Sequence, residues 1–470
     1  MTNPDSAASA ASAASAASAL LPHNQPHLKT ELQAQLDAQP ISPLQWRVII
    51  LCWLVNMLDG FDLLAISFAA PAIAKAWQLA PQTLGVVFSS GLLGMMAGSL
   101  IFGPAADHVG RRRMIIFACL VLAISMLATA YANSVGQLML LRGITGMAIG
   151  ALLPSLNTLV AEYTPDRRKN LAISFMHIGY PIGGIAGGWL ASQLIPTNGW
   201  PALFWLGGLF TLAIMPMIFF GLPESLHYLL QKNQPAAKAK AVKIARRMGL
   251  AIQSDILNTS ANKTNLDQAS RQTLRTILHR PWLAPSLALW ACFFLSNLTL
   301  YFLLNWTPSI LTTAGLPASQ AMRAGMLLNF GGVIGMLSIG YLSTRWSLYY
   351  LMSGYFILGG LFIIALGQLP TSEYLLLGFT LLSGLFSLGG LIGLYSFTAR
   401  LYPTTTRATG IGLAIGAGRF GAILGPYAGG LLISLGWPMS NYFALLTLPL
   451  IAVAGVLWWV KQPTMSHHNN

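Results

Sequence analysis

Apolar residues form long runs along nearly the whole chain, and shorter polar stretches separate them. Most runs hold roughly 20 residues or more, the length at which a helix rising about 1.5 Å per residue crosses about 30 Å of hydrocarbon. A spanning strand would instead show about 10 residues of alternating polarity, so the pattern predicts helices. We predict twelve spans, at residues 48–73, 84–106, 114–133, 137–161, 171–195, 201–222, 282–304, 321–342, 349–368, 373–399, 408–433 and 441–460.

The spans divide into two sets of six around one long polar stretch. This division predicts an all-α membrane protein with two six-helix bundles, at 47–222 and 282–461, and a cytoplasmic linker loop at 223–281. Residues 1–46 hold Ser-Ala repeats with neither a basic start nor a long apolar core, so we expect a disordered cytoplasmic tail and not a signal peptide. Residues 462–470 form a second, short tail.

The linker contains a cationic segment of good helix formers, PAAKAKAVKIARRM at 235–248. Two interpretations stay open for it. The segment lies along the anionic inner leaflet and tethers the two halves, or it is a solvated linker helix without specific contacts.

An internal repeat relates the two halves. The stretch PDRRKNLAISFMHIGYPIGGIAGG (165–188) aligns with PTTTRATGIGLAIGAGRFGAILGP (403–426), and the alignment matches Gly183 with Gly421. Transporters are often built from two related halves. The repeat therefore predicts that the two bundles are pseudo-symmetric.

Composition and charge agree with a membrane protein. Of all residues 55% are apolar and 8% are charged, whereas soluble domains carry about a quarter charged residues. The net charge of +14 could indicate nucleic-acid binding, but the cations concentrate in the loops on one side, as the positive-inside rule requires. We therefore expect a bilayer and no nucleic acid as partner, and both termini in the cytoplasm. Besides the linker, the inner cations are Arg111, Arg112, Arg113, Arg167, Arg168, Lys169, Arg345, Arg400 and Arg407.

The sequence lacks the residue patterns that disulfide frameworks, metal sites and enzymatic catalysis require. The three cysteines all fall inside predicted spans, which indicates no disulfide framework. The sequence contains no phosphate-binding loop, no Cys/His metal spacing and no nucleophile elbow. We expect neither an enzyme nor an ATP-driven pump, and no cofactor or metal.

The loop between the second and third spans carries the motif FGPAADHVGRRRM, residues 102–114. Gly103 would allow close helix approach, Asp107 places a negative charge at the membrane boundary, and Gly110 permits a tight reversal. The motif resembles the loop motif of the major facilitator superfamily, with His108 where an arginine is usual. The three arginines that would anchor the loop are Arg111, Arg112 and Arg113.

A closer resemblance is to the aromatic acid:proton symporter family of that superfamily. It rests on DGFD, LRGITGMAIGALLP, AEYTPDRRKN, LPESLHYL, YFLLNWTPSIL and YPTTTRATGIGLAIGAGRFGAILGP. The resemblance implies import of a small aromatic carboxylate together with protons. The polar residues that it ties to transport are Asp59, Asp62, Arg142, Glu162, Arg407 and Arg419.

Two carboxylates, Asp59 and Asp62, lie within the first span, and Asn56 extends them to a polar stripe with a three-residue repeat. An ionised acid at that depth costs several kcal/mol unless it is paired, hydrated or protonated. Such a group is suited to carry a proton, and two adjacent acids spread their titrations. The alternative is a structural ion pair between helices.

Two arginines also lie within spans. Arg419 stands among glycines near mid-membrane, where a guanidinium could bind a substrate carboxylate through two hydrogen bonds. The alternative is a pair with Asp59 or Asp62. Arg142 is a second candidate ligand; it lies nearer the outer face, where snorkelling of its side chain lessens the cost of its charge.

Further polar groups line other spans. On the seventh span Asn297, Tyr301 and Asn305 recur every four residues with Trp306 beside them, which suits an aromatic acid or ordinary packing. His177 and Tyr180 on the fifth span are possible cavity groups, although for His177 we favour a packed histidine that a neighbour satisfies. At the inner ends of the spans we interpret Glu162, Arg400, Asp107 and Arg407 as gate pairs.

Together these features predict a proton-coupled symporter of the bacterial inner membrane, expected as a monomer, that works by alternating access. The resemblance implies that its substrate is a benzoate or hydroxybenzoate. A major facilitator antiporter that exports drugs and a chemosensory transporter are the alternatives.

Overall fold

The computed structural model describes residues 35–232, 234–250, 277, 282–368, 372–402 and 406–466, without the side chains of 399, 407, 408 and 460–466. Most of the predicted N-terminal tail and of the linker therefore lies outside the described residues. The first bundle consists of α3 (Pro43–Trp77), α4 (Pro81–Val109), α5 (Arg111–Thr129), α6 (Val135–Tyr163), α7 (Asp166–Asn198) and α8 (Pro201–Gly221). The second consists of α12 (Leu283–Thr313), α13 (Ala318–Leu342), α14 (Leu348–Gly367), α15 (Glu373–Leu401), α16 (Arg407–Ser434) and α17 (Met439–Ser466).

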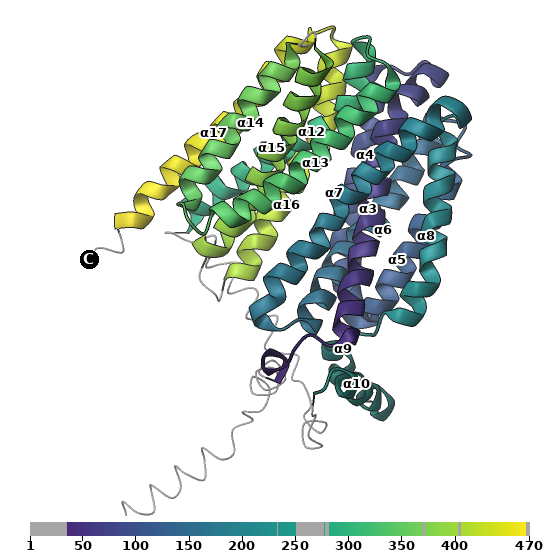
Figure 1. Ribbon diagram of the computed structural model, residues 1–470, viewed down its shortest axis with the longest axis vertical. Helices are drawn as coiled ribbons and strands as arrows, with labels where there is room; N and C mark the ends of the chain where they lie inside the picture. Colours follow the sequence, from purple (N-terminus) through teal and green to yellow (C-terminus); the bar gives the residue numbers. More distant parts are fainter. Residues whose placement is uncertain are drawn as a thin grey trace, which may run out of the picture.

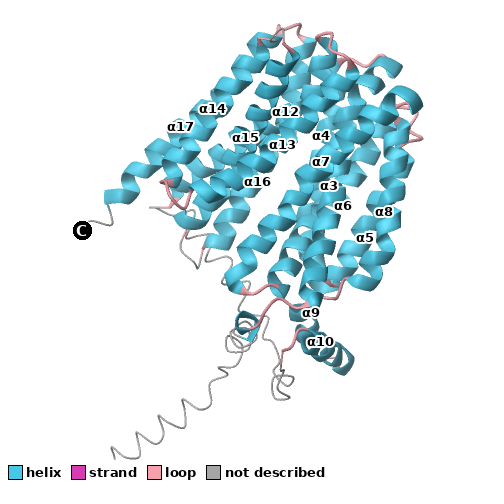
Figure 2. Cartoon of the chain, viewed as in Figure 1, coloured by secondary structure: helices cyan, strands magenta, loops and turns pink. Residues whose placement is uncertain are grey.

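All twelve predicted spans coincide with these long helices, and the described ranges contain no strand (Figure 2). Eleven of the helices are long and apolar enough to cross a membrane. The exception is α7, because its first turn is charged and its middle is rich in glycine. The all-α fold expected from the sequence is thus confirmed.

The first helix begins at Pro43, four residues before the expected bundle boundary. Ser42 caps it, since its hydroxyl accepts from Gln45 N while the Gln45 side chain accepts from Ser42 N. The Gln45 amide also donates to the carbonyl of Tyr163 over 2.8 Å. This bond fixes the start of α3 to the end of α6.

The two bundles repeat one packing scheme. In each bundle the first helix packs on the fifth (α3 on α7, α12 on α16), the second on the fourth, and the third on the sixth. Gly183 and Gly421, matched by the sequence repeat, allow these crossings, because a Cβ there would lie 1.9 Å from the Met57 oxygen and 2.0 Å from the Phe294 oxygen. The repeat found in the sequence therefore describes equivalent helix crossings.

Helices α3, α4 and α7 of the first bundle face α12, α16 and α13 of the second (Figure 1). Two short helices, α9 (Leu226–Gln231) and α10 (Pro235–Arg247), lie at the end of the molecule where α3 begins and α17 ends. We call this the linker end and the other the far end.

The cationic linker segment forms α10. Its apolar face, Ala241, Ile244 and Ala245, is buried, whereas most of its cations are exposed. Helix α10 packs on α9, and Gln39 donates to the carbonyl of Gly249 just after it. A linker helix without specific contacts is therefore the wrong interpretation.

Candidate functional site

The polar stripe of α3 lies inside the first bundle. Asn56, Asp59 and Asp62 are all 0% exposed. The Asn56 amide donates to the carbonyl of Met176 on α7 over 2.9 Å. The stripe therefore faces neighbouring helices and not lipid.

Asp62 forms a buried ion pair with Arg142 of α6. The Nη1 of Arg142 lies 3.2 Å from the Oδ1 of Asp62, and its Nη2 donates to the hydroxyls of Thr129 and Thr145 at 3.0 and 3.2 Å. The guanidinium also lies over the ring of Phe204. The expected snorkelling of Arg142 is wrong, because the residue is 3% exposed and its two terminal nitrogens have partners inside the bundle.

Asp59 differs from Asp62 in having no such partner. Neither of its carboxylate oxygens has a hydrogen-bond partner in the described part of the chain. Its charge interacts with those of Asp62 and Arg419. A buried carboxylate without hydrogen bonds is costly when it is ionised and much less so when it carries a proton.

Arg419 approaches from the second bundle on α16 and is half-buried. Its Nη1 donates to the carbonyl of Met95 on α4 over 3.4 Å. Among the described side chains, no carboxylate lies within ion-pair distance of the Arg419 guanidinium. In this conformation Arg419 is therefore not paired with Asp59 or Asp62, which was the alternative from the sequence.

Three tyrosines share this region. The charge of Arg419 acts on Tyr301 of α12 and Tyr395 of α15. Tyr180 of α7 interacts electrostatically with Tyr301 and Asp59. We call Arg419, Asp59 and these three tyrosines the central site. Sequence reasoning missed Tyr395, because a tyrosine in an apolar span is common and its hydroxyl gives the only signal.

The two asparagines of α12 bind within their own helix. Asn297 donates to the carbonyl of Phe293, and Asn305 to that of Tyr301, both at 2.8 Å. These bonds use one amide hydrogen each. The structure thus brings Tyr301 into the central site. The side-chain amides of Asn297 and Asn305 each form a hydrogen bond within α12.

The bundles touch along the halves of their helices that lie toward the far end. Trp306 of α12 packs edge-to-face on Phe88 of α4, with ring centroids 5.3 Å apart. Ser67 of α3 and Ser89 of α4 donate to carbonyls of α12 and α16 at 2.7 Å. Figure 1 shows the bundles converging toward this end. Trp306 therefore helps to close the far end in this conformation.

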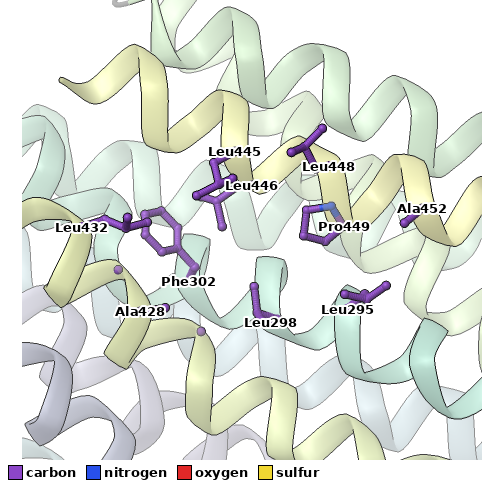
Figure 3. Close-up of a pocket in the computed structure, with 12 residues that line it drawn as sticks. Leu295, Leu298, Phe302, Ala428, Leu432, Leu445, Leu446, Leu448, Pro449 and Ala452 are labelled. Carbon is purple, nitrogen blue, oxygen red and sulfur yellow. The ribbon is translucent and has the colours of Figure 1, made fainter. Parts of the chain in front are cut away.

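Two cavities lie near these helices. Asp62, Arg142 and Asn305 line one of about 10 Å³, which suits about one water molecule. The other, of about 390 Å³, lies between α12, α16 and α17 and is lined by apolar residues such as Phe302 and Leu446 (Figure 3). A carboxylate in that cavity would lack a polar partner. The central site is therefore the better candidate for an anionic ligand.

The loop motif between α4 and α5 forms a polar network within the first bundle. Arg111 pairs with Asp107 at 2.9 Å and with Glu162 of α6 at 3.5 Å. Gly110 has a φ of +108°, so the predicted tight reversal is confirmed. At Gly103 a Cβ would meet nothing within 4 Å, so the expected close helix approach is wrong there.

Glu224, just after α8, supports this loop and was not singled out from the sequence. It is 5% exposed, and its Oε1 accepts the backbone N–H groups of Arg112 and Ser225, both at 3.0 Å. The Ser225 hydroxyl donates to Glu162 over 2.6 Å and accepts from Arg111 over 3.1 Å. The linker is thus bonded to the first bundle.

The expected gate pairs do not join the two bundles here. Asp107 and Glu162 pair with Arg111 inside the first bundle. Arg400 is exposed, and the Arg407 side chain lies outside the described residues. Between described side chains, no ion pair links the bundles at the linker end.

Comparison with known proteins agrees with this architecture. A model of the Major Facilitator Superfamily matches residues 52–372. The chain is 35% identical to the 4-hydroxybenzoate transporter PcaK of Pseudomonas aeruginosa, over 91% of this chain and 95% of that protein. It is 34% identical to the gallate transporter of Pseudomonas putida, over 89% and 92% of the two chains.

A solved structure shares the fold. The partially occluded inward-open conformation of the xylose transporter XylE from E. coli superposes with a TM-score of 0.70 at 16% identity, over 89% of this chain and 98% of that one. The chain belongs to the major facilitator superfamily and is a transporter, not an enzyme. The resemblance to its aromatic acid transporters is confirmed.

Proposed function

We propose that this chain is a proton-coupled symporter that imports a small aromatic carboxylate, of the benzoate or hydroxybenzoate type, by alternating access. The observation that carries the proposal is Arg419: a half-buried guanidinium between the bundles, with one backbone hydrogen bond and no carboxylate partner among the described side chains. The relatives at 35% and 34% identity are named for aromatic acids. A central cation suits an anionic substrate better than a cationic drug.

In the proposed complex the substrate carboxylate binds the planar fork of Arg419 through two hydrogen bonds. The hydroxyls of Tyr301 and Tyr395 lie within the field of the same charge and can donate further hydrogen bonds. Their rings offer faces and edges against which an aromatic ring packs. We also propose that four residues on neighbouring helices contact substrate in other conformations: Arg142, Asn297, Asn305 and Trp306.

We assign the transported proton to Asp59 and a positioning role to Asp62. Asp59 has no hydrogen-bond partner that favours its ionised form, whereas Arg142 favours ionised Asp62. Protonation of Asp59 removes a negative charge that competes with the substrate for Arg419. A proton also offsets the charge of the anion, since each charge moved against 100 mV costs about 2.3 kcal/mol.

For the surroundings we propose a monomer in a bacterial inner membrane with both termini in the cytoplasm. The cation-rich loops and α10 then lie on the inner side. The bundles at 47–222 and 282–461 would be the moving units, joined by the linker 223–281. The contacts at the far end then correspond to a state closed to the outside, and the inner-loop residues Asp107, Gly110 and Arg111 to a gate element.

Uptake by proteoliposomes tests the function. Labelled benzoate, 4-hydroxybenzoate and gallate are offered with and without an imposed pH gradient, and efflux of a cationic dye is measured in parallel. We expect gradient-driven accumulation of at least one acid, and its loss in Arg419→Ala. Arg323→Ala, at an exposed arginine outside the site, is the matched control. Dye efflux without acid uptake would contradict the proposal and favour an antiporter.

A further inference from the structure

The hydroxyl of Tyr180, at the central site, plays no part in the transport step proposed above. The phenol oxygen of Tyr180 is buried, and it has no hydrogen-bond partner in the described ranges of the chain. Buried polar groups in folded proteins nearly always have a partner. An unpaired hydroxyl next to a ligand site therefore suggests that the ligand supplies the partner.

Helix α7 holds Tyr180 at a fixed position relative to α3. A Cβ at Gly60 of α3 would lie 2.0 Å from the backbone oxygen of Tyr180. On α7 itself, a Cβ at Gly179 or Gly183 would lie 2.6 or 1.9 Å from backbone oxygens of α3. At these points the backbones of α7 and α3 are in close contact. The Tyr180 hydroxyl thus belongs to a closely packed pair of helices.

Tyr180 and Arg419 approach the central site from opposite bundles. Tyr180 belongs to α7 of the first bundle and Arg419 to α16 of the second, and Tyr301 interacts electrostatically with both. A benzoate is planar and rigid, and a substituent at its 4-position points directly away from the carboxylate. Of the three tyrosine hydroxyls at the central site, that of Tyr180 is the one that is buried without a hydrogen-bond partner among the described residues, so we place that substituent at Tyr180.

We propose that the Tyr180 hydroxyl binds a ring hydroxyl opposite the substrate carboxylate, and so makes the transporter prefer 4-hydroxylated benzoates over benzoate. The inference rests on the proposed function, namely on carboxylate binding at Arg419. Two phenol groups form a hydrogen bond with either one as donor. A site built for a hydroxyl discriminates against the analogue without it, because the protein's own buried hydroxyl is then left unpaired.

Calorimetric binding to the purified full-length protein tests this inference. The ligands are benzoate, 3-hydroxybenzoate and 4-hydroxybenzoate, and the proteins are the wild type, Tyr180→Phe and Tyr395→Phe. We expect the wild type to bind 4-hydroxybenzoate about tenfold more tightly than the other two acids, the effect of about one neutral hydrogen bond. Tyr180→Phe keeps the ring and its packing but cannot pair with a ring hydroxyl, so 4-hydroxybenzoate should lose its advantage and bind no more tightly than benzoate. Tyr395→Phe, beside Arg419, should weaken all three alike and keep their ratios.

Two results would overturn the inference. If Tyr180→Phe weakened benzoate and 4-hydroxybenzoate by the same factor, Tyr180 would act on the carboxylate or on packing. If the variant kept the wild-type ratio, the ring hydroxyl would be bound elsewhere. Failure of the wild type to bind any of the acids, with thermal unfolding showing a folded protein, would instead contradict the proposed function itself. The two failures are therefore distinguishable.

Discussion

At the residue scale, two acids three positions apart on one helix have different surroundings. Asp62 shares a hydrogen-bonded ion pair with Arg142, at 3.2 Å, while both oxygens of Asp59 lack a hydrogen-bond partner among the described residues. Removing one member of a buried pair leaves the other charge uncompensated, whereas neutralising an unpaired buried acid removes a cost. We therefore expect substitution of Asp59 to impair proton coupling and substitution of Asp62 to lower the stability of the protein.

We predict that Asp59→Asn abolishes gradient-driven accumulation but leaves the unfolding temperature unchanged or raised, since the amide mimics the protonated acid. Exchange of internal for external substrate needs no net proton movement and should survive. Asp62→Asn should instead destabilise the protein by about 3–5 kcal/mol, because Arg142 is left buried and unpaired. Thermal unfolding in detergent and proteoliposome uptake are the two measurements.

The double variant Asp62→Asn with Arg142→Gln provides the control for that contrast. It removes both charges, so much of the lost stability should return. If Asp59→Asn still concentrated substrate in response to a pH gradient, Asp59 would not carry the proton. Equal destabilisation by both single variants would contradict the difference in pairing.

Arg419 gives the second prediction at this scale. Arg419→Ala should lower the affinity for an aromatic acid by about 2–5 kcal/mol, the effect of removing one partner of a desolvated charge pair. Arg419→Lys should restore the affinity only in part, because an ammonium cannot reproduce the planar fork. Calorimetry measures both variants, and unchanged affinity in Arg419→Ala would move the carboxylate to another cation such as Arg142.

The sequence identified these charged residues because a charge in an apolar span is conspicuous. It could not identify their partners: Asp62 and Arg142 stand 80 positions apart, and which of two acids Arg142 meets depends on how α3 and α6 pack. Tyrosines give a weaker signal, since a ring alone is at home in an apolar span. Tyr395 was therefore missed, and Tyr180 was found only as a possible cavity group.

At the element scale, the loop motif contains two glycines, Gly103 and Gly110, for which the sequence predicted a backbone role. Their surroundings in the structure differ. Gly110 ends α4 with a φ of +108°, and a Cβ there would lie 2.6 Å from the Oε2 of Glu224. Gly103, seven residues earlier on the same helix, has open space around it. A sequence motif shows which residues are present, but the clash at Gly110 depends on Glu224, which is more than 100 positions away.

We predict that Gly110→Ala sharply reduces uptake and that Gly103→Ala, its control on the same helix, does not. The alanine at 110 would both strain the backbone and displace the Glu224 carboxylate from the N–H groups of Arg112 and Ser225. Initial uptake rates, corrected for the amount of protein in the membrane, compare the two variants. Equal rates would show that the turn tolerates a side chain and that Glu224 can move.

At the scale of the whole molecule, repetition of the crossing glycines in both halves made the fold predictable from the sequence. The conformation was not predictable, because alternating states use the same helices and differ only in which ends of the bundles touch. In this structure α4 and α16 touch toward the far end, where a Cβ at Gly85 would lie 2.8 Å from the Pro426 oxygen. Such an approach is available only to glycine.

The last prediction uses this contact to shift the equilibrium between conformations. Gly85→Val cannot fit against α16, and an overpacked contact typically costs about 1–3 kcal/mol. Since that cost falls only on the state whose far end is closed, the population of the open state should rise about tenfold. A cysteine replacing Ser89, which is 6% exposed, then reacts faster with a maleimide, while uptake falls. The native cysteines Cys52, Cys119 and Cys292 are buried and give the background.

Gly354→Val is the matched control, because a Cβ at Gly354 would meet no atom within 4 Å. It should change neither the labelling rate of the cysteine at position 89 nor uptake. If Gly85→Val left both quantities at the values of the control, the contact between α4 and α16 would not belong to a state that opens and closes. Faster labelling without loss of uptake would show that opening of the far end does not limit the transport cycle.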